Sequence, residues 1–311
     1  MRALILRDIG GDLSVGDLPE PVPAAGEVIV EMVYAAVNPL DVWVAQGTPG
    51  AAAANLPWVP GTEGTGYVDG QPVLVRGAGL GVIRQGTIGE RLAAPATAVH
   101  KVSGELDLAQ VAGIGVAGGT AWEVVHTKAH VSAQDRVLVL GASGGVGSLA
   151  VQLAKACGAT VWGQTTNKAK VDGIAADHVV VADDTSLVAA LDGYEPTVVL
   201  DGLGGGYTRA AIDALAAAGR LVNYGASAGE QVAFNVRTFY RKGLTLLSYS
   251  GLLQSPAENQ ATINTVLKAL ADGTLHVPVE IVPLRDAANV HHRILAREVE
   301  GKLVVDLRAP A

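Results

Sequence analysis

A glycine-rich turn between an apolar strand and an apolar helix is the clearest chemical motif in the sequence. Residues 136–147 read RVLVLGASGGVG, which differs from G-x-G-x-x-G only in having Ala142 at the first glycine. Gly144 lets the backbone approach a phosphate, and Gly147 lets the helix pack closely on its strand. The free N–H groups at the helix start attract negative charge. The segment predicts a dinucleotide pyrophosphate site formed by Ser143, Gly144, Gly145, Val146 and Gly147.

The strand that follows carries the residues that distinguish NADPH from NADH. An NAD enzyme usually places an acidic residue about 20 positions beyond the glycines, but no Asp or Glu stands between Asp135 and Asp172. Hydroxyls, an amide and two lysines stand there instead, and they suit a 2′-phosphate. Lysines that only solvate a helix start are the alternative. We predict NADPH, bound by Thr165, Thr166, Asn167 and Lys170, with the choice between Lys168 and Lys170 for the phosphate left open.

Around this turn the sequence predicts two kinds of domain. The first hundred residues form short β-rich runs separated by Gly and Pro, whereas from about Gly118 strands alternate with helices, as in a parallel sheet with crossover connections. The predicted early strands are 2–7, 27–37, 71–76 and 89–94, with a loop over 43–61. The later strands are 136–141, 160–163, 178–181, 197–200 and 220–224, separated by helices over 145–157, 168–175, 185–191 and 207–217. A tail follows with helices over 257–271 and 286–297 and strands over 277–282 and 302–306.

Composition excludes several classes of protein. A chain of 311 residues with 49% hydrophobic residues can build two packed domains, and it is not a disordered chain. The net charge of −8 repels phosphate backbones and anionic membranes, so we expect neither a nucleic acid nor a membrane as partner. The uncharged run 137–154 is interrupted by glycines, so it is read as strand, turn and helix. The early charges at the N-terminus do not resemble a signal peptide, and we expect a cytoplasmic protein.

Several motifs along the chain occur in the order typical of one superfamily. They are VNPLD at 37–41, VPGTEGTG at 59–66, GTAW at 119–122 at an expected helix start, the glycine turn, VLD at 199–201, GRLV at 219–222 and GKLV at 301–304. In these the chain resembles the medium-chain dehydrogenase/reductase superfamily, in its zinc-free quinone oxidoreductase-like and enoyl reductase-like branch. The resemblance implies an α/β protein, with a Rossmann doubly wound parallel sheet plus a GroES-like β-rich, partly barrel-shaped domain. The GroES-like domain would take residues 1–115, completed by about 256–311, and the Rossmann domain 116–255.

The resemblance also implies roles for individual residues. Asn38 is the best candidate to orient the substrate or the nicotinamide ribose, and Asp41 would anchor its loop. Trp43, where relatives often have Tyr, would form an aromatic wall or simply pack in a loop. Tyr249 would supply a proton or be structural, with water as the default proton source. The nicotinamide contacts implied are Thr120, Gly225, Ala226 and Ser227, with Ser248 and Tyr249 nearby, and the implied assembly is a homodimer.

Zinc-dependent relatives place a catalytic Cys near Asn38 and a His near Thr62, and this chain has neither ligand there. Its single cysteine, Cys157, cannot form a multi-thiolate site. The pairs His126/His130 and His291/His292 lack a third ligand nearby, so we expect surface histidines and no metal.

Hydride transfer from NADPH needs an electron-poor carbon held close and a donor for the oxygen that becomes negative. A quinone or an α,β-unsaturated carbonyl compound answers this description, so the first prediction is a reductase of such small-molecule acceptors. The alternatives are an enoyl reductase for a carrier-bound biosynthetic intermediate and a non-enzymatic protein that binds NADPH.

Overall fold

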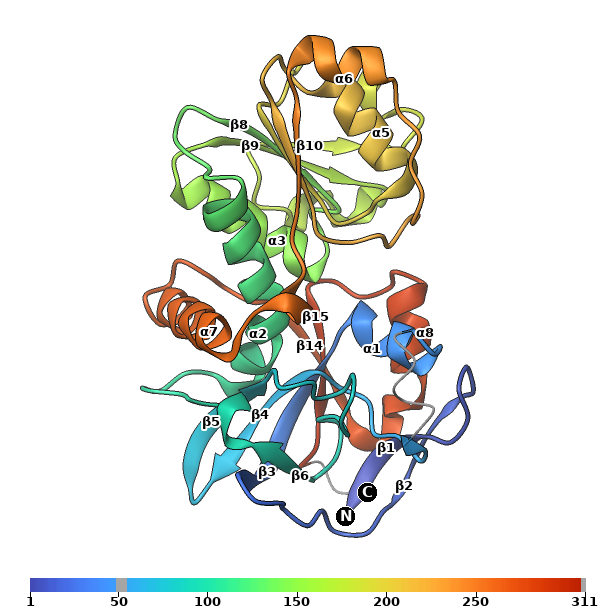
Figure 1. Cartoon of the computed structure of the whole chain (residues 1–311), viewed down its shortest axis with the longest axis vertical. Helices are drawn as coiled ribbons and strands as arrows, with labels where there is room; N and C mark the ends of the chain where they lie inside the picture. The colour runs from blue at the N-terminus through green and yellow to red at the C-terminus, as the bar shows by residue number, and fades with distance from the viewer. Residues whose placement is uncertain (49–54, 309–311) are drawn as a thin grey trace. The chain divides into compact units, whose positions relative to one another are not determined.

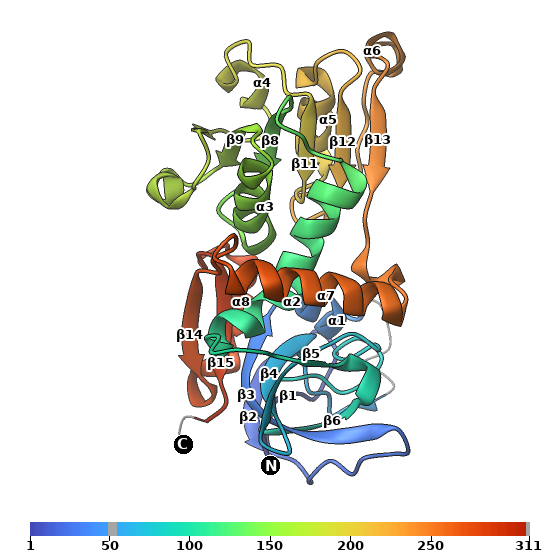
Figure 2. The same ribbon diagram turned by 90° about the vertical axis from the view of Figure 1, so that its left-hand side faces the viewer.

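The computed structural model describes residues 1–48 and 55–308, and contacts divide the chain into two compact units (Figure 1, Figure 2). Unit 1 comprises Met1–Val116 and Leu252–Ala311, and unit 2 comprises Ala117–Gly251. Part of the predicted loop 43–61 lies outside the described residues. The predicted fold class is confirmed, because unit 2 contains a parallel sheet and unit 1 is a separate β-rich unit.

Unit 2 is built on six parallel strands in the order β10-β9-β8-β11-β12-β13. The chain winds outward from β8 in one direction and then from β11 in the other, so right-handed crossovers place helices on both faces. The strands are β8 Arg136–Leu140, β9 Thr160–Thr165, β10 His178–Val181, β11 Val198–Asp201, β12 Arg220–Asn223 and β13 Thr245–Ser248. The helices are α3 Gly145–Ala156, a 3₁₀ segment Lys168–Gly173, α4 Leu187–Ala190, α5 Gly205–Ala214 and α6 Val236–Lys242.

Unit 1 is a mostly antiparallel sheet in the order β14-β15-β3-β4-β5-β7, with β6 paired to β3 and a separate β1-β2 pair. Its strands are β1 Arg2–Leu6, β2 Leu13–Asp17, β3 Glu27–Val37, β4 Glu63–Val68, β5 Gln71–Arg76, β6 Arg91–Pro95, β7 Val99–Lys101, β14 Val279–Pro283 and β15 Lys302–Asp306. The helices are α1 Pro39–Ala45, α7 Pro256–Ala271 and α8 Val290–Leu295. The final strand β15 pairs with β3, so the end of the described chain completes the sheet that its beginning starts.

Helix α2, Leu108–Trp122, corrects the expectation that GTAW at 119–122 opens a helix. These residues end a helix that starts eleven positions earlier, and a π-helical segment, Glu123–Lys128, continues it. The glycines of α2 allow close packing: a Cβ at Gly113 would lie 3.2 Å from Lys302 side-chain atoms. Residues Leu108–Lys128 are long and apolar enough to span a membrane, yet 67% of their apolar window is buried in the fold.

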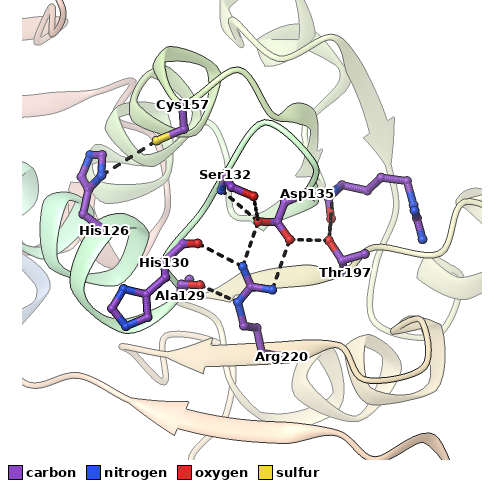
Figure 3. A network of polar contacts seen from close by, with 9 residues as sticks. His126, Ala129, His130, Ser132, Asp135, Cys157, Thr197 and Arg220 are labelled. Carbon is purple, nitrogen blue, oxygen red and sulfur yellow. Dashed lines mark hydrogen bonds and ion pairs between the residues drawn. The ribbon is translucent and has the colours of Figure 1, made fainter.

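An ion pair ties together the amino-terminal ends of the strands in unit 2 (Figure 3). Asp135, just before β8, accepts hydrogen bonds from both terminal nitrogens of Arg220 at 3.1 and 2.9 Å. Arg220 also donates to the carbonyls of Ala129 and His130, beyond the π-helical segment. Burial alone would raise the pKa of Asp135, but bonds from Arg220, Ser132 and Thr197 hold it below its ordinary value. The network fixes where the polypeptide enters the sheet.

The close approach of α3 to the turn before it generates a stability prediction. A Cβ at Gly147 would lie 2.9 Å from the Cα of Ala142 and closer still to the carbonyl oxygen of Gly141. Because both are backbone atoms, Gly147→Ala should destabilise the protein by about 2–3 kcal/mol despite the better helix propensity of Ala. Gly173→Ala is the control, because its Cβ would meet nothing within 4 Å. Urea unfolding followed by circular dichroism measures both, and equal stabilities would contradict the packing argument.

Candidate functional site

The predicted phosphate turn joins β8 to α3 and presents the start of that helix. Gly141 adopts a positive φ of 67°, and Gly144 is the N-cap residue of α3. Gly144 is exposed, while Gly145 and Val146 are half-buried. The first N–H groups of a helix have no intrahelical acceptor, so this turn can receive an anion.

Gln164, which the sequence motifs did not single out, holds the beginning of this turn. It is 1% exposed at the end of β9, and its side-chain oxygen accepts from the N–H of Gly141 at 2.9 Å. Its backbone carbonyl accepts from Ala142 N–H, and its side-chain NH₂ donates to the carbonyl of Ala182. The turn is therefore fixed to β9 before any ligand is present.

The residues predicted to meet the adenosine end follow directly after Gln164. Thr165 is buried, with its hydroxyl 3.3 Å from that of Ser143, whereas Thr166 and Asn167 are exposed. The side-chain oxygen of Asn167 accepts from Ala169 N–H and caps the 3₁₀ segment. That segment carries Lys168, exposed, and Lys170, half-buried. Hydroxyl, amide and ammonium groups thus stand at the end of β9, where an NAD enzyme has a carboxylate.

Asp201, at the end of β11, organises the next two loops. Its carboxylate is fully buried and accepts from the N–H groups of Leu203 and Gly204 at 2.8 and 3.0 Å, and from the side chains of Thr208 and Asn223. Asn223 also donates to the carbonyl of Gly225 at 2.9 Å. A buried charge with four donors is well compensated, so the loop after β12 is held in place.

The structure brings most predicted cofactor residues of unit 2 to one edge of the sheet. Because the strands are parallel, the segments after β8, β9, β12 and β13 all lie at their carboxyl ends. Ser227 donates to the carbonyl of Gly202, and Tyr249 N–H donates to the carbonyl of Asn223. Thr120, the remaining predicted residue, is buried in the last turn of α2. The edge segments are 141–147, 165–170, 225–227 and 248–249.

The predicted catalytic residues Asn38, Asp41 and Trp43 lie together in unit 1, where β3 turns into α1. Asn38 is the N-cap of α1 and is 4% exposed. Its backbone N–H donates to the Asp41 carboxylate at 2.7 Å, which explains the predicted anchoring role of Asp41. Trp43 is 37% exposed, so its indole is on the surface of unit 1 and not packed inside it.

Lys302 and Glu63 complete this cluster. In the sequence analysis these two charged residues appeared only as parts of motifs. Lys302, the first residue of β15, places its ammonium 2.5 Å from Asn38 Oδ1 and 3.0 Å from Glu63 Oε1. Both side chains are almost fully buried. The NH₂ group of Asn38 donates to Glu63 Oε1 at 3.0 Å and to Thr62 Oγ1 at 3.2 Å. Sequence reasoning did not place Glu63 and Lys302 in the site. The signal that could have found them is that each is a charged residue inside a motif, GTEG at 61–64 and GKLV at 301–304.

Asp41 is protonated more easily than an ordinary carboxyl group. Burial raises its pKa to about 7, against the smaller opposing effects of the Asn38 N–H and the charge of Lys302. The cluster therefore holds one ammonium and one carboxylate in close contact, with a second carboxyl group that titrates near neutrality.

Other candidate groups lie outside these clusters. His291 corrects the expectation of surface histidines: it is 9% exposed, and burial lowers its pKa to about 4, so it is neutral. Cys157 lies 3.8 Å from His126, and burial raises the pKa of its thiol, so it is not an activated nucleophile (Figure 3). A surface hollow of about 520 Å³ in unit 1 is lined by Leu18, Val22 and Arg84 among others, and by none of the predicted site residues.

Two family models match the chain. One is described as an alcohol dehydrogenase GroES-like domain and matches residues 24–135, and the other is described as a zinc-binding dehydrogenase and matches residues 145–272. Together they cover most of both units.

Relatives of two kinds match the chain. A phenolphthiocerol/phthiocerol polyketide synthase subunit from Mycobacterium tuberculosis is 30% identical over an alignment of 315 positions, which covers 95% of this chain but 14% of the synthase. The chain thus spans a small part of the length of that relative. A quinone oxidoreductase from Lama guanicoe is 34% identical over 166 residues, 50% of each chain.

Solved structures share the fold over nearly the whole chain. The quinone oxidoreductase from Thermus thermophilus, which was also solved with NADPH, is 27% identical, with a TM-score of 0.83 over 99% of this chain and 100% of its own. An NAD-dependent alcohol dehydrogenase is 28% identical, with a TM-score of 0.86 over 98% of this chain and 99% of its own.

The residues around Asn38 do not fit a zinc ion. The oxygens of Asn38 and Glu63 that would face a cation already face the Lys302 ammonium, and an ammonium repels a metal ion. Within residues 1–48 and 55–308, no group of three or more His, Cys, Asp or Glu side chains could hold a metal.

The pKa of Asp41 generates a prediction for stability against pH. The pKa of about 7 in the folded protein lies above the ordinary value of 3.8. Between these two pH values the folded state therefore binds more protons than the unfolded state. The contribution of Asp41 to the free energy of unfolding is fully present below about pH 4. It is lost as the pH rises through 7, by roughly 1.4 kcal/mol per pH unit. Chemical denaturation should show the parent losing stability relative to Asp41→Asn across this window. Parallel pH profiles for the two proteins would contradict the burial argument.

Proposed function

The chain belongs to the medium-chain dehydrogenase/reductase superfamily, in its quinone oxidoreductase-like branch, and from this premise we propose that it is an NADPH-dependent reductase of quinones or α,β-unsaturated carbonyl compounds. The observation that carries the proposal is the phosphate turn, followed at the end of β9 by hydroxyls and lysines in place of a carboxylate. The similarity to quinone oxidoreductases supports the class of acceptor.

The residues at the carboxyl edge of the parallel sheet fit NADPH. The start of α3, at Gly144–Gly147, would hold the pyrophosphate, and Thr165, Thr166, Asn167 and the lysines would hold the 2′-phosphate. The loop 225–227, held by Asp201 and Asn223, would hold the nicotinamide end, together with Ser248, Tyr249 and Thr120. When bound, NADPH supplies the hydride.

In this proposal, residues of the chain position the reacting groups. In the proposal Asn38 orients a hydroxyl group of the substrate or of the nicotinamide ribose, Asp41 anchors α1, and the exposed indole of Trp43 offers an aromatic surface to a flat acceptor. After the acceptor carbon gains the hydride, its oxygen carries the negative charge, and a proton from water completes the reduction. Burial and the nearby Asp201 carboxylate raise the pKa of Tyr224, so that phenol is not a ready acid.

The cofactor assignment predicts a selective effect of lysine removal. Lys170→Ala or Lys168→Ala, whichever side chain meets the 2′-phosphate, should weaken NADPH binding roughly ten- to a hundredfold because one charge-assisted contact is lost, and should leave NADH binding unchanged. Lys268→Ala, on the exposed side of α7, is the control. Calorimetric titration with both cofactors measures the effect. Equal losses for NADPH and NADH would refute the phosphate role.

A second acceptor class has a specific observation in its favour. The match of nearly the whole chain to part of a polyketide synthase favours an enoyl group on a carrier-bound intermediate. Stopped-flow oxidation of NADPH with a panel of quinones, simple enones and enoyl thioesters separates the two acceptor classes. Binding of NADPH without turnover on any acceptor would instead support the non-enzymatic role.

We also propose that the chain acts as a cytoplasmic homodimer, paired through β13. This strand ends the six-stranded sheet, and edge strands commonly pair with another chain unless charges or prolines protect them. The sequence TLLS of β13 has neither, and Leu246 is 38% exposed there. On α6, Val236 and Tyr240 are exposed as well.

The dimer proposal predicts the effect of a charge on the edge strand. Leu246→Lys should shift the protein from dimer to monomer in light scattering, because an ammonium would have to be buried in the interface. Val188→Lys on α4 is the control, since Val188 is 47% exposed and far along the sheet order from β13. A monomeric parent, or a dimeric Leu246→Lys variant, would contradict this assignment.

A further inference from the structure

We propose that Lys302, together with Glu63, is a positioning residue of the reductase: it holds the Asn38 amide in one of its two orientations, so that Asn38 can accept a hydrogen bond from a ligand but cannot donate one. This inference rests on the proposed function for its kinetic consequence. Its geometric basis lies entirely within unit 1.

The orientation of the Asn38 amide follows from its three partners. Its oxygen faces the Lys302 ammonium at 2.5 Å, and its NH₂ group faces Glu63 Oε1 and Thr62 Oγ1 at 3.0 and 3.2 Å. Rotating the amide by half a turn would set the NH₂ group against an ammonium and the oxygen against a carboxylate. Both contacts would be repulsive, so the charged pair selects one orientation.

The hydrogen-bonding capacity of these groups is almost fully used. An ammonium has three protons, and Lys302 directs them at Asn38, at Glu63 and at the carbonyl of Val37. Both NH₂ protons of Asn38 are also engaged. What remains is the second lone pair of Asn38 Oδ1. The group it can bind is a donor, such as a hydroxyl, and not the carbonyl oxygen of an acceptor.

The pair itself is fixed from its other side by α2. The second carboxylate oxygen of Glu63 accepts from the backbone N–H of Val116 at 2.6 Å. A Cβ at Gly115 would come within 2.8 Å of that oxygen, and a Cβ at Gly113 within 3.2 Å of Lys302. Two glycines of α2 therefore let the helix pack closely against both charged side chains. Because these contacts hold the ion pair in place, the ion pair in turn fixes the position of the Asn38 side chain.

The test uses the 311-residue chain and a variant that removes both charges. Removing one charge would leave the other buried and unpaired, so the variant is Lys302→Met with Glu63→Gln, which keeps similar volume. Its thermal unfolding should stay close to that of the parent. Its kcat, measured with NADPH and an acceptor that the parent reduces, should fall about a hundredfold, because a reacting group is misplaced. The dissociation constant for NADPH should change far less than kcat.

Two further measurements separate positioning from general stability. Asn38→Ala should lose as much kcat as the double variant, and combining all three changes should cost nothing more, because they act through one group. Lys101→Met, an exposed lysine on β7, is the control and should behave like the parent. Losses that multiply, or a double variant with parental kcat, would overturn the proposal.

A readout without turnover keeps the inference apart from the proposed function. With ¹⁵N-labelled asparagine, the side-chain amide protons of Asn38, assigned by their loss in Asn38→Asp, should exchange slowly with solvent in the parent and faster in the double variant. Fast exchange in the parent would overturn the geometry itself. Slow exchange in a protein that reduces no acceptor would leave the geometry standing and reject the reductase.

Discussion

The burial of the Lys302 ammonium among oxygen atoms is a strong constraint on the architecture of unit 1. A charge almost without solvent contact is tolerated only beside its partners, so β15, the start of β4 and the end of β3 must meet within hydrogen-bonding distance. The same requirement draws in the middle of α2 through the Glu63 contact to Val116 N–H. Sheet order and the corner at α1 are thus set by electrostatics as well as by apolar packing.

Unit 2 has different polar contacts at the two edges of its parallel sheet. At the amino ends of the strands, Asp135 and Arg220 form a bidentate pair whose partners are backbone carbonyls and neighbouring hydroxyls. At the carboxyl ends, Gln164 and Asp201 satisfy their polar atoms by holding loops, and the first N–H groups of α3 have no intrahelical acceptor. A rigid support on one edge with preformed loops on the other reduces the ordering that a ligand must induce.

Local patterns in the sequence predicted much of the fold. The strands expected at 27–37, 71–76, 178–181 and 302–306 have those bounds in the structure, because β-branched runs flanked by turn residues carry their own signal. Helix α2 was missed, because Gly113 and Gly115 serve close packing on Lys302 and Glu63, which no local pattern in the sequence indicates. The buried state of His291 was also missed, because burial is decided by the elements packed around α8.

The candidate site could be predicted only in part, because some of its residues are close in the sequence and others meet only in the folded chain. The phosphate turn is contiguous, so its spacing identifies it. Lys302 is 239 to 265 positions away from its partners in the cluster around Asn38, and no local pattern says which distant lysine will face which carboxylate. The predicted contacts of individual residues with a cofactor remain predictions.

The discontinuous course of unit 1 has a consequence for biosynthesis. Glu63 leaves the ribosome 239 residues before Lys302, which at bacterial or eukaryotic elongation rates is a delay of roughly 10–50 s. Unit 2 is synthesised whole within that interval and can fold as nascent chain, while the sheet of unit 1 still lacks β15 and the counter-ion for its innermost carboxylate. Unit 2, which lies in the middle of the sequence, can thus complete its fold first. Unit 1, whose two segments flank it in the sequence, completes its fold last.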